Sequence, residues 1–265
     1  MSAAPSMTYS AYLDLDRILG AQHPRSNAHD EMLFIIQHQT SELWMRLAIH
    51  EIDAARAAID SGAVAPAFKM LTRVARIFDQ LNGAWDVLRT MTPAEYTCFR
   101  DDLGASSGFQ SWQYRQIEFM LGNRDAGVIS RHREIPDAVA RLTAELARPS
   151  LYDCALRLAA HHGLPVPEAV LTRDLSQKYL PVEGVTDVWR QVYEAPEANW
   201  QLYELAEKLV DFEDYFRRWR FNHVTTVERI IGFKRGTGGT GGVNYLKAML
   251  EIELFPELWH VRTAL

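Results

Sequence analysis

Two histidines occupy positions that helical spacing assigns to buried, apolar faces. His223 lies on a stripe that includes Trp219 and Val227, and His38 follows Phe34 by one helical turn. Such a histidine is either a core side chain satisfied by one hydrogen bond or a ligand of a metal or haem. The second interpretation has a chemical basis, because neutral imidazole is the commonest metal donor and haem needs apolar walls. The two histidines belong to separate long helices and could face one cavity from opposite sides.

Tyr96 and Arg100 form a second candidate site. They stand at i, i+4 just inside a predicted helix, so that their side chains lie next to each other. A guanidinium beside a phenol can bind a carboxylate, and the alternative is a solvated surface pair. The glycines of Gly104–Gly108, which follow, would let the backbone approach a ligand closely.

A glycine-rich segment, Gly236–Gly241, matches the G-x-G-x-x-G nucleotide-binding fingerprint. That fingerprint requires a preceding strand, whereas a long helix is expected here. We therefore expect a flexible loop that folds over a ligand. Glu257 and His260 form a single Glu-x-x-His motif, whereas a di-iron bundle needs two such motifs and further glutamates.

Composition places the chain among ordinary globular proteins. Of 265 residues, 48% are hydrophobic and 23% are charged, and 28 basic against 34 acidic residues give a net charge of −6. This balance disfavours nucleic-acid binding, which depends on phosphate neutralisation. The two cysteines, Cys98 and Cys154, cannot supply a disulfide framework or covalent c-type haem attachment. Neither a signal peptide nor a membrane span is evident, so we expect a soluble intracellular protein.

The apolar spacing is helical nearly throughout, which predicts a single all-α domain built from long antiparallel helices. The strongest element runs from about 196 to 231, and at ~1.5 Å per residue it would extend roughly 50 Å. A Thr-Pro-Ala-Glu capping box predicts a helix start at Thr92. Within residues 123–185, only a helix start at Ser150–Asp153 and a loop at Gly163–Pro167 are predicted. The other expected elements are helices at Tyr9–Leu19, Asp30–Ile59, Ala65–Arg89, Gln110–Leu121 and Val243–Leu254, and a turn at Pro256–Arg262.

Four long segments carry a family resemblance. They are His29–Trp44, which contains Phe-Ile-Ile-Gln-His-Gln-Thr-Ser-Glu, then Ser106–Phe119, Ile231–Gly239 and Phe255–Thr263. Together they resemble the tryptophan 2,3-dioxygenase family over nearly the whole chain and in the same order.

The resemblance implies a cytoplasmic homotetramer of helical subunits, each with a non-covalent haem b. Ferrous haem and O2 would open the indole C2–C3 bond of L-tryptophan to give N-formyl-L-kynurenine. One alternative is a biosynthetic relative that adds one oxygen atom to a substituted tryptophan, such as a β-methyl derivative, to give an oxindole. Another is a haem-binding helical protein without catalysis.

The same resemblance assigns roles to individual residues. His223 corresponds to the axial ligand of the haem iron, and His38 to a catalytic residue that hydrogen-bonds the indole N–H. Ser107 lies near the haem and the bound oxygen. The remaining haem contacts are Trp85 and Tyr114. The remaining substrate contacts are Phe34 against the indole ring, Tyr96 and Arg100 on the carboxylate, Leu103 in the pocket, and Thr237 at the amino-acid end.

Tyr9 and Tyr12 correspond to residues that reach into a neighbouring subunit's site. The segment from about residue 1 to 25 is accordingly expected to be exchanged between subunits.

Overall fold

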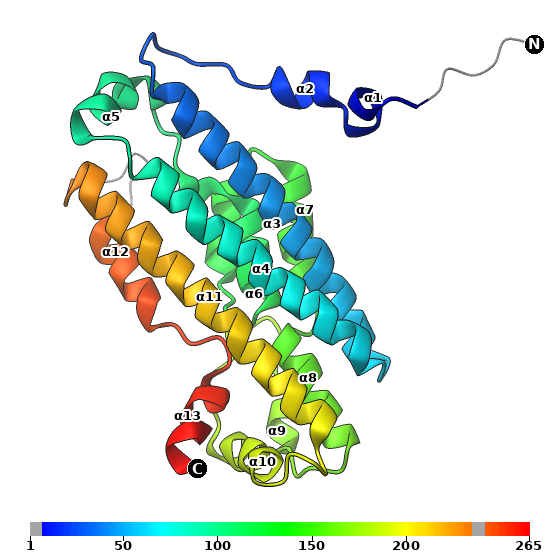
Figure 1. Cartoon of the computed structure of the whole chain (residues 1–265). Helices are drawn as coiled ribbons and strands as arrows, with labels where there is room; N and C mark the ends of the chain where they lie inside the picture. The colour runs from blue at the N-terminus through cyan, green and yellow to red at the C-terminus, as the bar shows by residue number, and fades with distance from the viewer. Residues whose placement is uncertain (1–6, 235–241) are drawn as a thin grey trace, which may run out of the picture.

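Three long helices form the frame of the molecule in the computed structural model, which describes residues 7–234 and 242–265. α4 (Val64–Leu88) lies between α3 (Glu31–Asp60) and α11 (Trp200–Ile231), as Figure 1 shows. No strand occurs within the described ranges, which confirms the predicted all-α class.

The directions of these helices differ in one respect from the expected antiparallel arrangement. A short turn after Asp60 reverses the chain, so α3 and α4 are antiparallel. Successive contacts between α4 and α11, however, advance together along both helices, from Phe78–Phe212 to Trp85–Trp219. These two helices therefore run parallel, because the long segment between them returns the chain to the end at which α4 begins (Figure 1).

The predicted apolar stripe fixes the orientation of α11. Leu202, Leu205, Leu209, Phe212 and Phe216 are all buried along it. Their 3-4 spacing puts them on one helix face, which packs against α4. The helix begins at residue 200 instead of 196, and its 32 residues span roughly 48 Å.

The predicted capping box at Thr92 is present and starts α5 (Pro93–Arg100). The Thr92 side chain accepts from the Glu95 backbone N–H, and the Glu95 carboxylate accepts from the Thr92 N–H at 2.6 Å. Pro93 occupies the first helical position, where its missing N–H costs nothing. Gly104, with φ of +56°, then ends a 3-10 turn and opens the loop that leads to the cavity described below.

Two terminal expectations are wrong. The single helix expected at Tyr9–Leu19 is divided into α1 (Tyr9–Leu13) and α2 (Leu15–Leu19), because Asp14 adopts a left-handed φ of 51°. The turn expected near the C-terminal end is instead α13 (Pro256–Ala264), which begins with proline at its first position.

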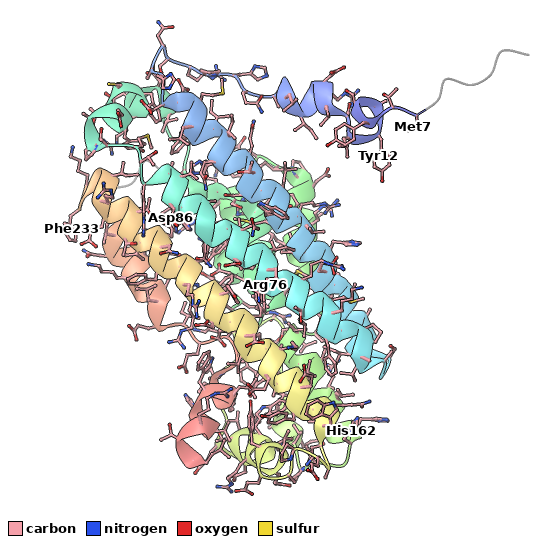
Figure 2. The ribbon with its side chains drawn as sticks, viewed as in Figure 1. Met7, Tyr12, Arg76, Asp86, His162 and Phe233 are labelled. Atoms are coloured by element: carbon pink, nitrogen blue, oxygen red, sulfur yellow. The ribbon has the colours of Figure 1, made fainter. Side chains whose placement is uncertain are left out.

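Residues 7–22 form an arm that extends away from the helical body. Figures 1 and 2 show its course, with Met7 and Tyr12 labelled far from α3. Neither α1 nor α2 has a buried residue. Hydrogen bonds from Gln39 to the Ala21 carbonyl and from Gln22 to Gln39 hold the base of this arm on α3.

The middle of the chain is helical as well. The helix start predicted at Ser150 is confirmed, because Ser150 and Asp153 form a capping box at the start of α8. The buried Arg124 guanidinium donates to the carbonyls of Phe119 in α6 and Leu146 in α7, and so connects these two helices. The shorter helices are α6 (Trp112–Met120), α7 (Pro136–Leu146), α8 (Leu151–His161), α9 (Glu168–Leu171), α10 (Glu183–Glu194) and α12 (Val243–Ala248), and the 3-10 segments are Asp101–Leu103, Gly108–Gln110, Ala126–His132 and Met249–Glu251.

Two buried carboxylates fasten the last helix to the body. Glu213 on α11 accepts from the backbone N–H groups of Leu254 and Phe255 and from Trp259 Nε1, at 2.6, 3.0 and 2.8 Å. Glu257 on α13 accepts two tyrosine hydroxyls and one backbone N–H, from Tyr152, Tyr179 and Val182. None of the described helices is both long and apolar enough to cross a bilayer.

Candidate functional site

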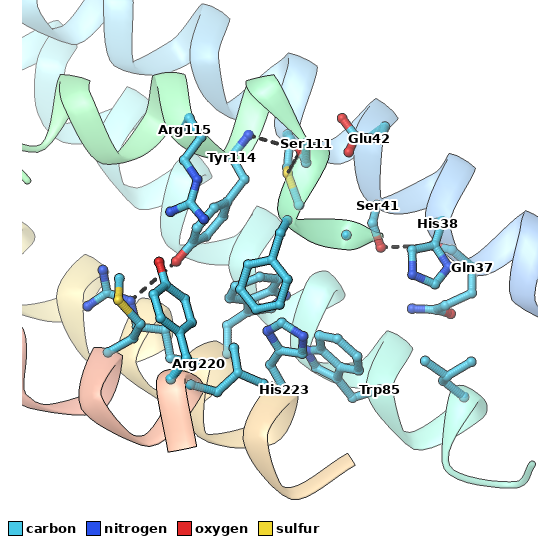
Figure 3. Close-up of a pocket in the computed structure, with 18 residues that line it drawn as sticks. Gln37, His38, Ser41, Glu42, Trp85, Ser111, Tyr114, Arg115, Arg220 and His223 are labelled. Atoms are coloured by element: carbon cyan, nitrogen blue, oxygen red, sulfur yellow. Dashed lines mark hydrogen bonds between the residues drawn. The ribbon is translucent and has the colours of Figure 1, made fainter. Parts of the chain in front are cut away.

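A cavity lies between α3, α4 and α11 and is closed by the loop of residues 101–111 and by α12. It has an inner chamber, which extends to Tyr114 and Arg220, and an outer chamber, which extends to Tyr96 and Ser107. The two chambers share seven lining residues: His38, Trp85, Leu88, Gly108, Phe109, His223 and Leu246. The structure therefore brings both candidate histidines to one cavity. Figure 3 shows His38 on α3 across from His223, which lies next to Trp85.

His223 is a neutral imidazole with a largely aromatic surround. Its ring stacks on Trp85 at 5.0 Å between centroids with an interplanar angle of 14°, and lies 5.5 Å from Trp219. Burial, with smaller contributions from His38 and Arg115, lowers the His223 pKa to about 4. No described residue hydrogen-bonds to its ring nitrogens, so a nitrogen lone pair is available to a metal.

The hydrogen bonding of His38 defines its tautomer. Its Nδ1 lies 2.7 Å from the Phe34 carbonyl oxygen, which can only accept. Nδ1 therefore carries the proton, and Nε2 is left as an acceptor. Burial lowers the His38 pKa, while the Phe34 carbonyl and the charge of Glu42 raise it by less. The net decrease keeps the ring neutral near pH 7.

The outer chamber contains four of the eight expected substrate contacts, Phe34, His38, Tyr96 and Leu103. Ser107, which was expected near the haem, lines it as well. The centroid of the Phe34 ring lies 4.2 Å from that of the His38 ring and 6.1 Å from that of the Tyr96 ring. The three rings therefore form one wall of the chamber. Ser107 comes from the glycine-bounded loop and accepts from the Phe109 N–H at 3.4 Å.

Arg100 lies at the rim of the outer chamber. It lines an adjoining hollow that shares Tyr96, Ile230, Ile231 and Lys234 with that chamber. Burial raises the Tyr96 pKa, and the positive charge and hydrogen bond of Arg100 oppose this shift. Tyr96 and Arg100 are therefore neighbours, as their i, i+4 spacing predicts.

Two of the expected substrate residues, Tyr9 and Tyr12, do not line this cavity. Thr237, with the predicted glycine loop, lies outside the described residues. Tyr9 and Tyr12 lie on the N-terminal arm, where each side chain is 76% exposed. Their helix, α1, lies away from the helical body (Figure 1).

The inner chamber ends in a charged cluster that the sequence did not indicate. Arg115 and Arg220 both bind the Glu118 carboxylate, at 2.5 and 3.2 Å. The expected haem contact Tyr114 joins this cluster, because its hydroxyl accepts from Arg220 Nε at 3.4 Å. Figure 3 shows Tyr114, Arg115 and Arg220 gathered at the end of the cavity away from His38. All three charged side chains are nearly fully buried, and together they carry one net positive charge.

These residues fit a haem. The neutral His223 imidazole could bind the iron of a haem as an axial ligand. The aromatic residues around it, together with Leu88 and Leu246, provide the apolar surface that a haem needs. Trp85 Nε1 is buried without a hydrogen-bond partner among the described residues, so it could donate to a bound group. Arg115 and Arg220 supply positive charge that could attract the carboxylate groups of a haem. Fold and site thus define an all-helical protein with an aromatic-lined cavity between two histidine-bearing helices.

Comparison with known proteins identifies the family. The profile described as tryptophan 2,3-dioxygenase matches residues 1–146 and 188–265, and the chain belongs to this family. The protein named tryptophan 2,3-dioxygenase from Bradyrhizobium diazoefficiens is 70% identical over 98% of this chain and 93% of its own length. The corresponding protein from Ruegeria pomeroyi is 64% identical over 99% and 94%, and tryptophan 2,3-dioxygenase 1 from Ralstonia nicotianae is 57% identical over 100% and 90%.

Proposed function

We propose that this chain is a haem-dependent dioxygenase that opens the indole C2–C3 bond of L-tryptophan with O2 to give N-formyl-L-kynurenine. Membership of the tryptophan 2,3-dioxygenase family supports the reaction class. One structural observation carries the assignment to this cavity: His38 and His223 face it from α3 and α11, and His38 presents an unprotonated Nε2. When bound, a non-covalent haem b would supply the ferrous iron chemistry that transfers both oxygen atoms to the indole.

His223 would hold the haem iron through its free ring nitrogen. Its stacking on Trp85 restricts rotation of the imidazole, and its low pKa keeps the nitrogen unprotonated at neutral pH. Trp85 and Tyr114 would line the haem in the inner chamber, and Ser107 would lie near the oxygen-binding side. The aromatic and aliphatic walls exclude water from the reacting atoms.

His38 and Phe34 would orient the indole. The tautomer fixed by the Phe34 carbonyl allows His38 Nε2 to accept the indole N–H, and the Phe34 ring provides an apolar surface for the indole face. His38 thus acts by orientation and need not remove the proton.

The amino-acid end of tryptophan would be bound at the rim of the outer chamber. Arg100 and Tyr96 would receive the carboxylate, Thr237 the remaining polar end, and Leu103 would contact the side chain. This arrangement rests on the adjacency of Arg100 and Tyr96 at the chamber mouth.

We also propose a cytoplasmic homotetramer in which the segment from about residue 1 to 25 is exchanged between subunits, and the N-terminal arm supports the exchange. An arm with no buried residue, and with Tyr9 and Tyr12 exposed, gains little by lying against its own chain. In the exchanged arrangement, these tyrosines would complete a neighbour's outer chamber.

The experiment that tests the reaction is turnover of L-tryptophan under ¹⁸O2, followed by mass spectrometry of the product. The proposal requires a product that contains two ¹⁸O atoms. A product with one ¹⁸O atom, or no turnover by haem-loaded protein, would refute it.

A further inference from the structure

The turn of α11 that carries His223 is held from outside the cavity by Arg89, the residue that ends α4. Arg89 Nε donates to Thr226 Oγ1 at 2.8 Å. Its Nη2 donates to Thr225 Oγ1, and lies 3.4 and 3.5 Å from the backbone and side-chain oxygens of Asn222. One guanidinium thus contacts the residue before His223 and the residues two and three positions after it.

The geometry of a helix makes this contact informative about His223. With 3.6 residues per turn, residues 222, 225 and 226 lie together on one face, and residue 223 projects about 100° around the axis from residue 222. A planar guanidinium with donors in fixed directions holds that face in one rotational position. Fixing the face that contacts Arg89 therefore also fixes the direction in which the His223 side chain leaves the helix.

Two other residues near the end of α4 contact His223 or the residue before it. Trp85, one turn before Arg89, stacks on the imidazole. Asn82, almost one turn before Trp85, accepts from Asn222 Nδ2 at 3.0 Å and donates to the Tyr215 carbonyl at 3.0 Å. The parallel arrangement of α4 and α11 makes these successive contacts possible.

Competing partners of Arg89 are weak. The carboxylate of Asp86 approaches Arg89 only to 3.9 Å, and the Asp86 side chain is 79% exposed. An ion pair of this kind contributes little in water. Thr226, by contrast, is almost completely buried, so the Arg89–Thr226 hydrogen bond is shielded from solvent.

We propose that Arg89 is a positioning residue that sets the orientation of the His223 imidazole toward the haem iron. This proposal rests on the assignment of His223 as the iron ligand. Arg89 acts through α11, since it lines a surface hollow and not the haem cavity.

The chain offers a matched control on the same pair of helices. Arg76 of α4 also donates to α11, through Nη1 to the Tyr215 hydroxyl at 2.8 Å. Figure 2 shows Arg76 midway along α4, and Asp86 closer to the end where Arg89 lies. Arg76→Ala removes an arginine that bridges α4 and α11 without touching the turn that carries His223.

The test compares Arg89→Ala, Arg89→Lys and Arg76→Ala as ferrous haem proteins. The readouts are the Fe–histidine stretching band in resonance Raman spectra and the rate of haem transfer to an apoprotein acceptor. Arg89→Ala should shift and broaden the band and raise the haem-loss rate by about tenfold, the loss expected from a charged hydrogen-bond donor. Arg89→Lys should fall between Arg89→Ala and wild type, because one ammonium cannot reach all three partners. Arg76→Ala should match wild type.

An unchanged band and haem-loss rate in Arg89→Ala would overturn the proposal. Equal changes in Arg76→Ala would also overturn it, since they would reflect general loosening of the helix pair. If Arg89→Ala does not fold, Thr225→Val provides the same test through one lost acceptor at a residue that does not line the cavity, and an unshifted band there refutes the proposal. His223→Ala separates the two assignments: full haem retention in that variant would reject the iron ligand itself, whatever Arg89 does.

Discussion

Replacement of His38 by alanine tests the hydrogen bond that its tautomer permits. In the wild-type protein, Nδ1–H is donated to the Phe34 carbonyl, and Nε2 is the only ring acceptor left for an indole N–H. His38→Ala removes that acceptor without touching His223. Haem content and O2 binding should therefore be retained, while turnover of tryptophan falls.

The size of the loss follows from the burial of this site. A buried N–H that is left without an acceptor costs about 1–3 kcal/mol, which corresponds to a decrease of roughly 5- to 150-fold in kcat/KM. Steady-state kinetics of His38→Ala and wild type, each with L-tryptophan and 1-methyltryptophan, measures this effect. The methylated substrate has no N–H to donate, so its kcat/KM should respond much less to the substitution.

Two outcomes would refute this reasoning about His38. Equal losses for tryptophan and 1-methyltryptophan would show that the imidazole acts by filling space, as a side chain packed 4.2 Å from the Phe34 ring also could. A loss of haem would show that His38 supports the cofactor and not the substrate.

Three further substitutions have defined outcomes. Arg100→Ala should weaken tryptophan binding by roughly 10- to 150-fold without loss of haem; equal weakening of tryptamine, which lacks the carboxylate, would contradict a carboxylate contact. His223→Ala should retain helical circular dichroism but lose stoichiometric haem, and an unchanged Soret band would disprove its role. Arg56→Ala breaks a buried ion pair in which the Arg56 side chain is 3% exposed and the Glu145 side chain 2% exposed. Because the Glu145 carboxylate loses its buried partner, the free energy of unfolding measured in urea should fall by about 3 kcal/mol. Arg17→Ala, which removes an exposed pair, is the control and should change it little.

Much of the fold follows from local sequence patterns. The stripe from Leu202 to Phe216 predicted α11 because burial of one helix face needs only a 3-4 repeat. The capping box at Thr92 depends on residues three positions apart, so it is also legible in sequence. The break at Asp14 was missed because its left-handed φ is uncommon for a residue other than glycine. The parallel arrangement of α4 and α11 depends on the route of the chain between them, which helical periodicity does not encode.

The site divides in the same way. Spacing along α3 and α11 predicted the inward positions of His38 and His223, and α5 spacing predicted the Tyr96–Arg100 pair. The charged end of the inner chamber was not predictable from spacing, because burial of Arg220 depends on Glu118, about one hundred residues earlier in the chain. A buried guanidinium is identified by its partners, and those are set by tertiary packing.

The Glu213 carboxylate, which helps to fasten α13, has a consequence for how the protein is made. Glu213 lies ten residues before His223 on α11, and its three donors all come from residues 254–259. During synthesis, α11 emerges from the ribosome before residues 254–259 do. The Glu213 carboxylate then lacks the three hydrogen-bond donors that compensate for its burial in the folded protein. The nascent helix cannot dock completely against its neighbours until the following forty or so residues have emerged. We therefore expect haem capture to follow the emergence of α13, since the helix that bears His223 reaches its final position only when α13 packs over Glu213.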